Sequence, residues 1–77
     1  MTDIKSAAEY IIKAVVSDSE HVEVVTREEN QLTIIEVSAP PEIVGQIIGK
    51  EGKIIKSIRT LLNLAFPELH YLLQIKE

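Results

Sequence analysis

Apolar residues recur every three or four positions over residues 3–17, which is the spacing of one face of a helix. Asp3 stands at the start of this segment, where a carboxylate favours the positive end of a helix. We therefore expect a first helix over residues 3–17. Its apolar positions are Ile4, Ala7, Ala8, Ile11, Ala14 and Val15.

The sequence pattern then changes to one that is typical of β-strands. Residues 21–27 and 31–38 are dominated by β-branched side chains, and polar residues 27–30 separate the two segments. This pattern predicts two antiparallel strands joined by a hairpin connection over residues 27–30.

Helical spacing returns after Pro40 and Pro41, which end the second strand and are tolerated in the first turn of a helix. A short helix is predicted over residues 42–48. A longer helix begins at Gly52 or Lys53 and continues to Ala65, before Pro67 stops it. Apolar residues then alternate with mainly polar ones over residues 69–76, which predicts a third strand. The expected order is αββααβ, an α+β fold.

The connection between the two later helices is the tetrapeptide Gly49-Lys50-Glu51-Gly52. A turn this short needs backbone angles that are open mainly to glycine, and a missing Cβ also lets a ligand approach the backbone closely. The next helix presents unpaired N–H groups and its positive dipole end to this turn. We therefore expect the turn to hold a phosphate group.

Charge is distributed unevenly along the chain. The whole protein has 8 Lys and Arg against 12 Asp and Glu, a net charge of -4. Residues 45–60 carry four basic residues and one acidic residue, so this segment is +3 and the remainder is -7. A solvated helix face is the alternative interpretation. A positive stripe beside a glycine turn favours phosphate binding instead.

Residues 44–59, VGQIIGKEGKIIKSIR, resemble the V-I-G-x-x-G-x-x-I core of a KH domain, whose GxxG loop clamps about four nucleotides of single-stranded nucleic acid. The element order is similar to the type II KH fold, a three-stranded sheet with helices packed on one face. The chain resembles the small single-domain bacterial KhpA family over essentially its whole length, as one domain of residues 1–77. The resemblance implies cytoplasmic single-stranded RNA binding, as an RNA chaperone or post-transcriptional regulator, often beside a larger KH-containing protein.

The resemblance also implies which residues meet the RNA. One of the adjacent Ile47 and Ile48 should line the groove while the other packs inside, and Ile55 and Ile58 are expected in the core. Residues 33–37 of the second strand are expected to form the opposite wall. Glu51 departs from the family pattern by placing a carboxylate in the loop. The expected RNA-binding residues are Gly45, Ile47, Ile48, Gly49, Lys50, Glu51, Gly52, Lys53, Lys56 and Arg59.

Other chemistries lack a supporting pattern. The chain has no cysteine, and its two histidines have no neighbouring ligands or nucleophile in sequence, so we expect no enzyme, metal or cofactor. Gly45 to Lys50 has three residues between its glycines, where a nucleotide-binding P-loop needs four. The three aromatic residues do not form an RRM-type stacking platform. Charged residues interrupt every apolar stretch, so no membrane span is expected.

A protein-interaction module with weak or degenerate nucleic-acid binding is the alternative function. The strand at 31–38 is apolar on both faces, with Leu32 and Ile34 on one face and Ile35 and Val37 on the other. Helices on one side of the sheet would leave the other apolar face uncovered. This pattern favours a homodimer, or a heterodimer with a larger KH-containing protein.

Overall fold

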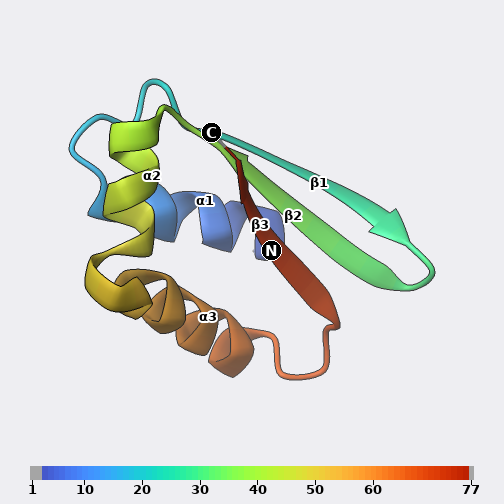
Figure 1. The fold of residues 1–77 in the computed structure, drawn as a ribbon. Coiled ribbons are helices and arrows are strands. Elements are labelled where there is room, and N and C mark those ends of the chain that lie inside the picture. The colour runs from blue at the N-terminus through green and yellow to red at the C-terminus, as the bar shows by residue number, and fades with distance from the viewer. Residues whose placement is uncertain (1–2, 77) are drawn as a thin grey trace.

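The computed structural model describes residues 3–76. The elements follow the predicted order and make an α+β fold (Figure 1). They are α1 (Ile4–Val15), β1 (Glu23–Glu29), β2 (Leu32–Ser38), α2 (Pro41–Ile48), the 3-10 turn η1 (Lys50–Gly52), α3 (Lys53–Ala65) and β3 (Tyr71–Lys76). This arrangement confirms the KH-like fold expected from the sequence.

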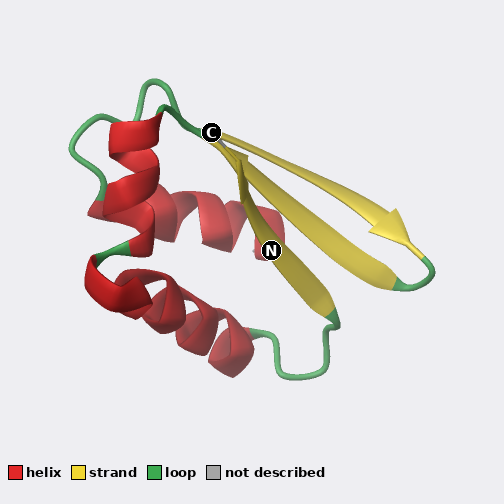
Figure 2. Ribbon diagram, viewed as in Figure 1, coloured by secondary structure: helices red, strands yellow, loops and turns green. Residues whose placement is uncertain are grey.

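The three strands form one mixed sheet in the order β1-β2-β3. β1 pairs antiparallel with β2, and β3 pairs parallel with β2 on its other side. The crossover from β2 to β3 contains both later helices, and all three helices lie on one side of the sheet (Figure 2). The central position of β2 means that both of its backbone edges are occupied.

The first helix begins where the sequence predicts. The Asp3 carboxylate accepts a hydrogen bond of 2.8 Å from the backbone N–H of Ser6, and this bond lowers the pKa of Asp3. The helix ends at Val15, two residues before the predicted end.

The predicted hairpin connection over residues 27–30 is wrong. β1 continues to Glu29, and a two-residue turn of Asn30 and Gln31 links it to β2. Both turn residues have positive φ, 51° and 69°, as the tight turns that match strand twist require. Asparagine tolerates this conformation, whereas the polar run alone does not reveal where the chain reverses.

One hydrophobic core lies between the helices and the inner face of the sheet. The largest fully buried side chains come from every layer: Ile12, Ile35, Val37, Ile47, Ile58 and Leu62. Ile55 is also buried, which confirms the core positions predicted for Ile55 and Ile58. The core therefore holds α2 and α3 in fixed positions on either side of the glycine turn.

The face of the sheet without helices is not an open apolar surface. Ile34 lies between Arg27 of β1 and Leu72 of β3 in the strand register, and only 4% of it is exposed. The Arg27 guanidinium binds Glu36, two residues further along β2, and Lys76 approaches the same carboxylate at 3.3 Å. The hydrogen bond from Arg27 lowers the pKa of Glu36. β2 is thus apolar on both faces as predicted, but the protein itself covers Ile34.

Candidate nucleic-acid interface

The two glycines of the turn are required for different physical reasons. Gly49 ends α2 with φ 76°, and its N–H donates to the carbonyl of Gly45 at 2.9 Å. A Cβ on Gly49 would lie 2.3 Å from Cγ1 of Ile54, which is far inside van der Waals contact. Gly52 has φ 74° and donates to the carbonyl of Gly49 at 3.1 Å, but a Cβ there would meet no close atom. Gly49 is therefore fixed by space and backbone angle, and Gly52 by backbone angle alone.

Glu51 also adopts the left-handed conformation, with φ 57° and ψ 25°. A residue with a Cβ pays roughly 1–2 kcal/mol to adopt this conformation. The sequence names Glu51 as a loop residue with an unfavourable charge but does not predict this backbone angle, because nothing in the residue type signals it. Three of the four loop residues thus have positive φ, which gives the turn its sharp reversal.

The first turn of α3 has none of the usual features of a satisfied helix start. Its N-cap is Gly52, no side chain caps its N–H groups, and no acidic residue lies in the first turn. Lys53 lies at the first position instead. A helix N-terminus carries unpaired N–H groups and a partial positive charge, so a lysine there adds to the charge rather than compensating it. Helix ends without a cap are favourable places for anions in proteins generally.

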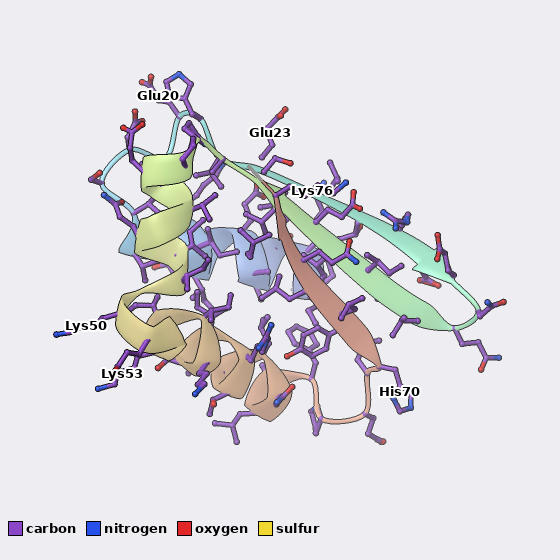
Figure 3. The ribbon with its side chains drawn as sticks, in the orientation of Figure 1. Glu20, Glu23, Lys50, Lys53, His70 and Lys76 are labelled. Carbon is purple, nitrogen blue, oxygen red and sulfur yellow. The ribbon has the colours of Figure 1, made fainter. Side chains whose placement is uncertain are left out.

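The four basic residues of the positive segment do not all lie together. Lys50 and Lys53 project from the same corner of the molecule, beside the turn between α2 and α3 (Figure 3). Lys56 follows on α3, whereas Arg59 lines a groove against β3. Within residues 3–76, these four side chains form no ion pair, while Lys13, Arg27 and Lys76 do. The cations nearest the turn are therefore exposed and uncompensated.

The α2 side of the turn matches the predicted division of its isoleucines. Ile47 is fully buried, and 38% of Ile48 is exposed. Gly45 lies on the exposed surface of α2, where a Cβ would meet nothing within 4 Å. Gln46 exchanges hydrogen bonds with Ser17 at 2.8 and 3.0 Å, which fastens α2 to the segment after α1. The exposed wall beside the turn therefore consists of Gly45 and Ile48.

The backbone groups of the strand expected to form the opposite wall are already paired within the sheet. Residues 33–37 belong to β2, whose backbone groups pair with β1 on one edge and β3 on the other. They cannot offer backbone hydrogen bonds to a ligand. β3, like β1, is an edge strand, and a groove of about 410 Å³ runs between β3 and α3. Arg59, Asn63 and Tyr71 line this groove, and the last two are not among the residues that the sequence predicts to bind RNA.

No cluster of three or more potential metal ligands occurs among residues 3–76. His21 contacts Asp18 at 3.3 Å, and His70 lies beside the start of β3, away from the turn (Figure 3). No helix in this part of the chain is long and apolar enough to cross a membrane.

Comparison with known protein families identifies the type of domain that contains this turn. The family model "KhpA/KhpB, KH domain" matches residues 5–70, which include α1 from its second residue, both strands of the hairpin, α2, the turn and α3. The chain belongs to the KhpA/KhpB KH-domain family. Its match ends just before β3, so the groove against β3 lies partly outside the matched residues.

Relatives in this family cover most of the chain. The RNA-binding protein KhpA of Caldanaerobacter subterraneus subsp. tengcongensis is 44% identical over 71% of this chain and 73% of its own length. The RNA-binding protein KhpA of Chlamydia pneumoniae is 42% identical, with 77% and 76% covered. That of Thermotoga maritima is 37% identical, with 78% and 80% covered. No solved structure matches the chain.

Proposed function

We propose that this protein binds single-stranded RNA and holds its phosphate backbone at the turn of residues 49–52. The relatives named above are RNA-binding proteins, and KH domains bind single strands through such a turn. The observation that carries the proposal is the start of α3, which has no capping side chain and no acidic residue but has exposed lysines beside it. A phosphodiester supplies the negative charge that this helix end lacks.

Each residue then has a definite task. The backbone N–H groups of the turn and the first turn of α3 bind phosphate oxygens, and Lys50 and Lys53 add charge. Gly45 permits close approach along α2, and Ile48 offers an apolar surface to a base or sugar. Ile47 supports this wall from the core rather than touching RNA. Glu51 projects from a strained position in the turn and weakens the attraction without removing the N–H donors.

Substitution of Lys50→Asp tests this assignment. The side chain is exposed and forms no ion pair among residues 3–76, so the melting temperature should change little. The phosphate would then meet two adjacent carboxylates, and we expect the affinity for a uridine oligonucleotide to fall at least tenfold by fluorescence anisotropy.

Lys5→Asp is the matched control, because it makes the same charge change at an exposed lysine of α1. It should leave the affinity nearly unchanged. Equal losses in the two variants would mean that only net charge matters, and no loss in either would remove the turn from the binding site.

A role in protein association, with a second copy or a larger KH-containing protein, is favoured by one observation on the helix-free face of the sheet. Val25 and Leu72 are 52% and 43% exposed there, with Val25 opposite Glu36 of β2 and Leu72 opposite the buried Ile34. The test uses these two exposed residues, because replacing Ile34 would disturb the fold. Val25→Thr with Leu72→Lys should abolish association by sedimentation while the protein stays folded. A wild-type protein that stays monomeric, both alone and when mixed with a larger KH-containing protein, excludes this role.

A further inference from the structure

The groove between α3 and β3 contains side chains whose hydrogen-bonding groups converge. Arg59 and Asn63 come from α3, Tyr71 from β3, and Leu69 and His70 from the connection between them. The groove lies at the opposite end of α3 from the turn, about 15 Å along the helix from Lys53 at a rise of about 1.5 Å per residue. A strand held at the turn could therefore bring a later nucleotide to this groove.

Tyr71 fixes the orientation of Asn63. The Tyr71 hydroxyl lies 2.8 Å from Oδ1 of Asn63, to which it donates, and 3.3 Å from the carbonyl oxygen of Arg59. Burial raises the pKa of Tyr71, so the hydroxyl keeps its proton and remains a donor at neutral pH. Because the oxygen of the planar amide points at Tyr71, the amide NH₂ is the end that remains for a ligand.

Arg59 and Asn63 therefore present donors rather than acceptors to the groove. The Arg59 guanidinium has five N–H groups and no acceptor, and the Asn63 amide adds its NH₂ group. Leu69, exposed at the rim, provides apolar surface for the flat face of a base. Guanine offers two adjacent acceptors, O6 and N7, whereas adenine replaces O6 with an amino donor that would meet the donors of the groove.

We propose that this groove is a base-specific subsite that selects guanine over adenine in the bound RNA. Arg59 and Asn63 read the O6 and N7 edge of the base. Tyr71 is a positioning residue, which acts by holding the Asn63 amide in the orientation that turns its donors outward. The subsite rests on the proposed RNA binding at the turn, and it adds sequence preference to a backbone contact that carries none.

The test compares uridine oligonucleotides that carry a single guanine, adenine or inosine at each position in turn. Inosine keeps O6 and N7 but lacks the exocyclic amino group of guanine. At the best position, wild-type protein should bind the guanine and inosine oligonucleotides about fivefold or more tightly than the adenine one. Equal affinity for the three purines at every position overturns the subsite.

Two variants test the two roles, base contact by Asn63 and positioning of its amide by Tyr71. Asn63→Ala should reduce the guanine-to-adenine ratio toward one by removing a donor. Tyr71→Phe keeps the ring and its packing but frees the amide to rotate, and it should reduce the same ratio. Ser57→Ala, also on the exposed surface of α3, is the control and should leave the ratio unchanged. A guanine preference that survives both Asn63→Ala and Tyr71→Phe would contradict this assignment.

The failure of the subsite can be distinguished from the failure of RNA binding. Wild-type protein that binds uridine oligonucleotides without purine preference retains the proposed function and loses only the subsite. Wild-type protein that binds none of the oligonucleotides loses both. Circular dichroism of each variant confirms that the fold is intact before its ratio is interpreted.

Discussion

The beginnings of α1 and α3 differ in how their backbone N–H groups are capped. At α1, the Asp3 carboxylate accepts a hydrogen bond from the backbone N–H of Ser6. At α3, glycine precedes the helix, no side chain caps it, and lysine occupies its first position. A side chain of the protein thus satisfies a backbone N–H group at the start of α1, whereas the start of α3 is left without such a partner.

The two helix starts also differ in whether they contribute to the stability of the fold or to RNA binding. The cap at α1 contributes to folding whether or not RNA is present. The exposed charge and the positive φ angles at the turn oppose folding. They persist because the buried residues of α2 and α3, packed in the hydrophobic core, fix the chain on both sides of the turn. Changes at α1 should therefore alter stability alone, and changes at the turn should alter RNA binding.

The largest effect is expected from Gly49→Ala. The new Cβ would overlap Ile54, and alanine is disfavoured at φ 76°, so we expect a loss of about 2–3 kcal/mol in the free energy of unfolding. Urea denaturation measures this loss. RNA affinity should fall as well, because the N–H groups of the turn move.

Gly45→Ala is the matched control for Gly49→Ala. A Cβ at Gly45 meets no atom within 4 Å and its backbone is helical, so stability should rise by about 0.5–1 kcal/mol. RNA affinity should nevertheless fall severalfold if a strand approaches α2 there. An affinity equal to that of the wild type would exclude Gly45 from the interface.

Salt should weaken RNA binding strongly. If two to four phosphates are neutralised, the logarithm of the affinity should fall against the logarithm of salt concentration with a slope of roughly -1.5 to -3. Anisotropy titrations over a range of potassium chloride concentrations measure the slope. A slope near zero would mean that Lys50, Lys53, Lys56 and Arg59 are only a solvated face.

A smaller effect is expected at the other helix start. Asp3→Ala removes the cap of α1 and should lower the melting temperature by a few degrees, while Asp3→Asn, which can still accept a hydrogen bond, should lower it less. Neither variant should change RNA affinity. A loss of RNA affinity in either variant would contradict the view that the start of α1 serves stability and the start of α3 serves RNA binding.

The smallest effect is a dependence of stability on acid pH. The folded protein depresses the pKa of Asp3 through the Ser6 hydrogen bond and that of Glu36 through Arg27. Each ionised carboxylate therefore favours the folded state above its unfolded pKa, near 3.8 and 4.5, and this contribution is lost as pH falls through the lower folded value. Melting temperatures should be steady at neutral pH and decline below about pH 4.5, less steeply in Asp3→Asn. A decline that begins near neutral pH would assign the effect to other groups.

Much of the fold could be predicted because hydrophobic spacing and the prolines specify the elements. The apolar stripe of α3 identified Ile55 and Ile58 as core residues, and the glycine spacing located the turn. The hairpin reversal at Asn30 and Gln31 escaped prediction, because the polar residues before it are equally compatible with a loop or an edge strand. One sequence also does not reveal strand order, so the expectation that β2 offers free backbone groups to a base did not anticipate its central position between β1 and β3.

Within the candidate site, residue types indicated the positive segment but not its geometry. Lys50 and Lys53 share a corner, whereas Arg59 turns to the groove with Asn63 and Tyr71. Asn63 is neutral and lies ten positions after Lys53, so its residue type does not indicate that it lines a groove. Its position there becomes clear only when β3 is placed beside α3. The left-handed conformation of Glu51 likewise depends on the helices that enclose the turn.

The most direct test is an amide chemical-shift titration of the protein with single-stranded uridine RNA. We expect the largest shifts at the amides of residues 49–54, with smaller ones along α3 and almost none at residues 4–7 in the first turn of α1. Shifts concentrated on the helix-free face of the sheet, or equal shifts at the two helix starts, would contradict the claim that the uncapped end of α3 is the phosphate site.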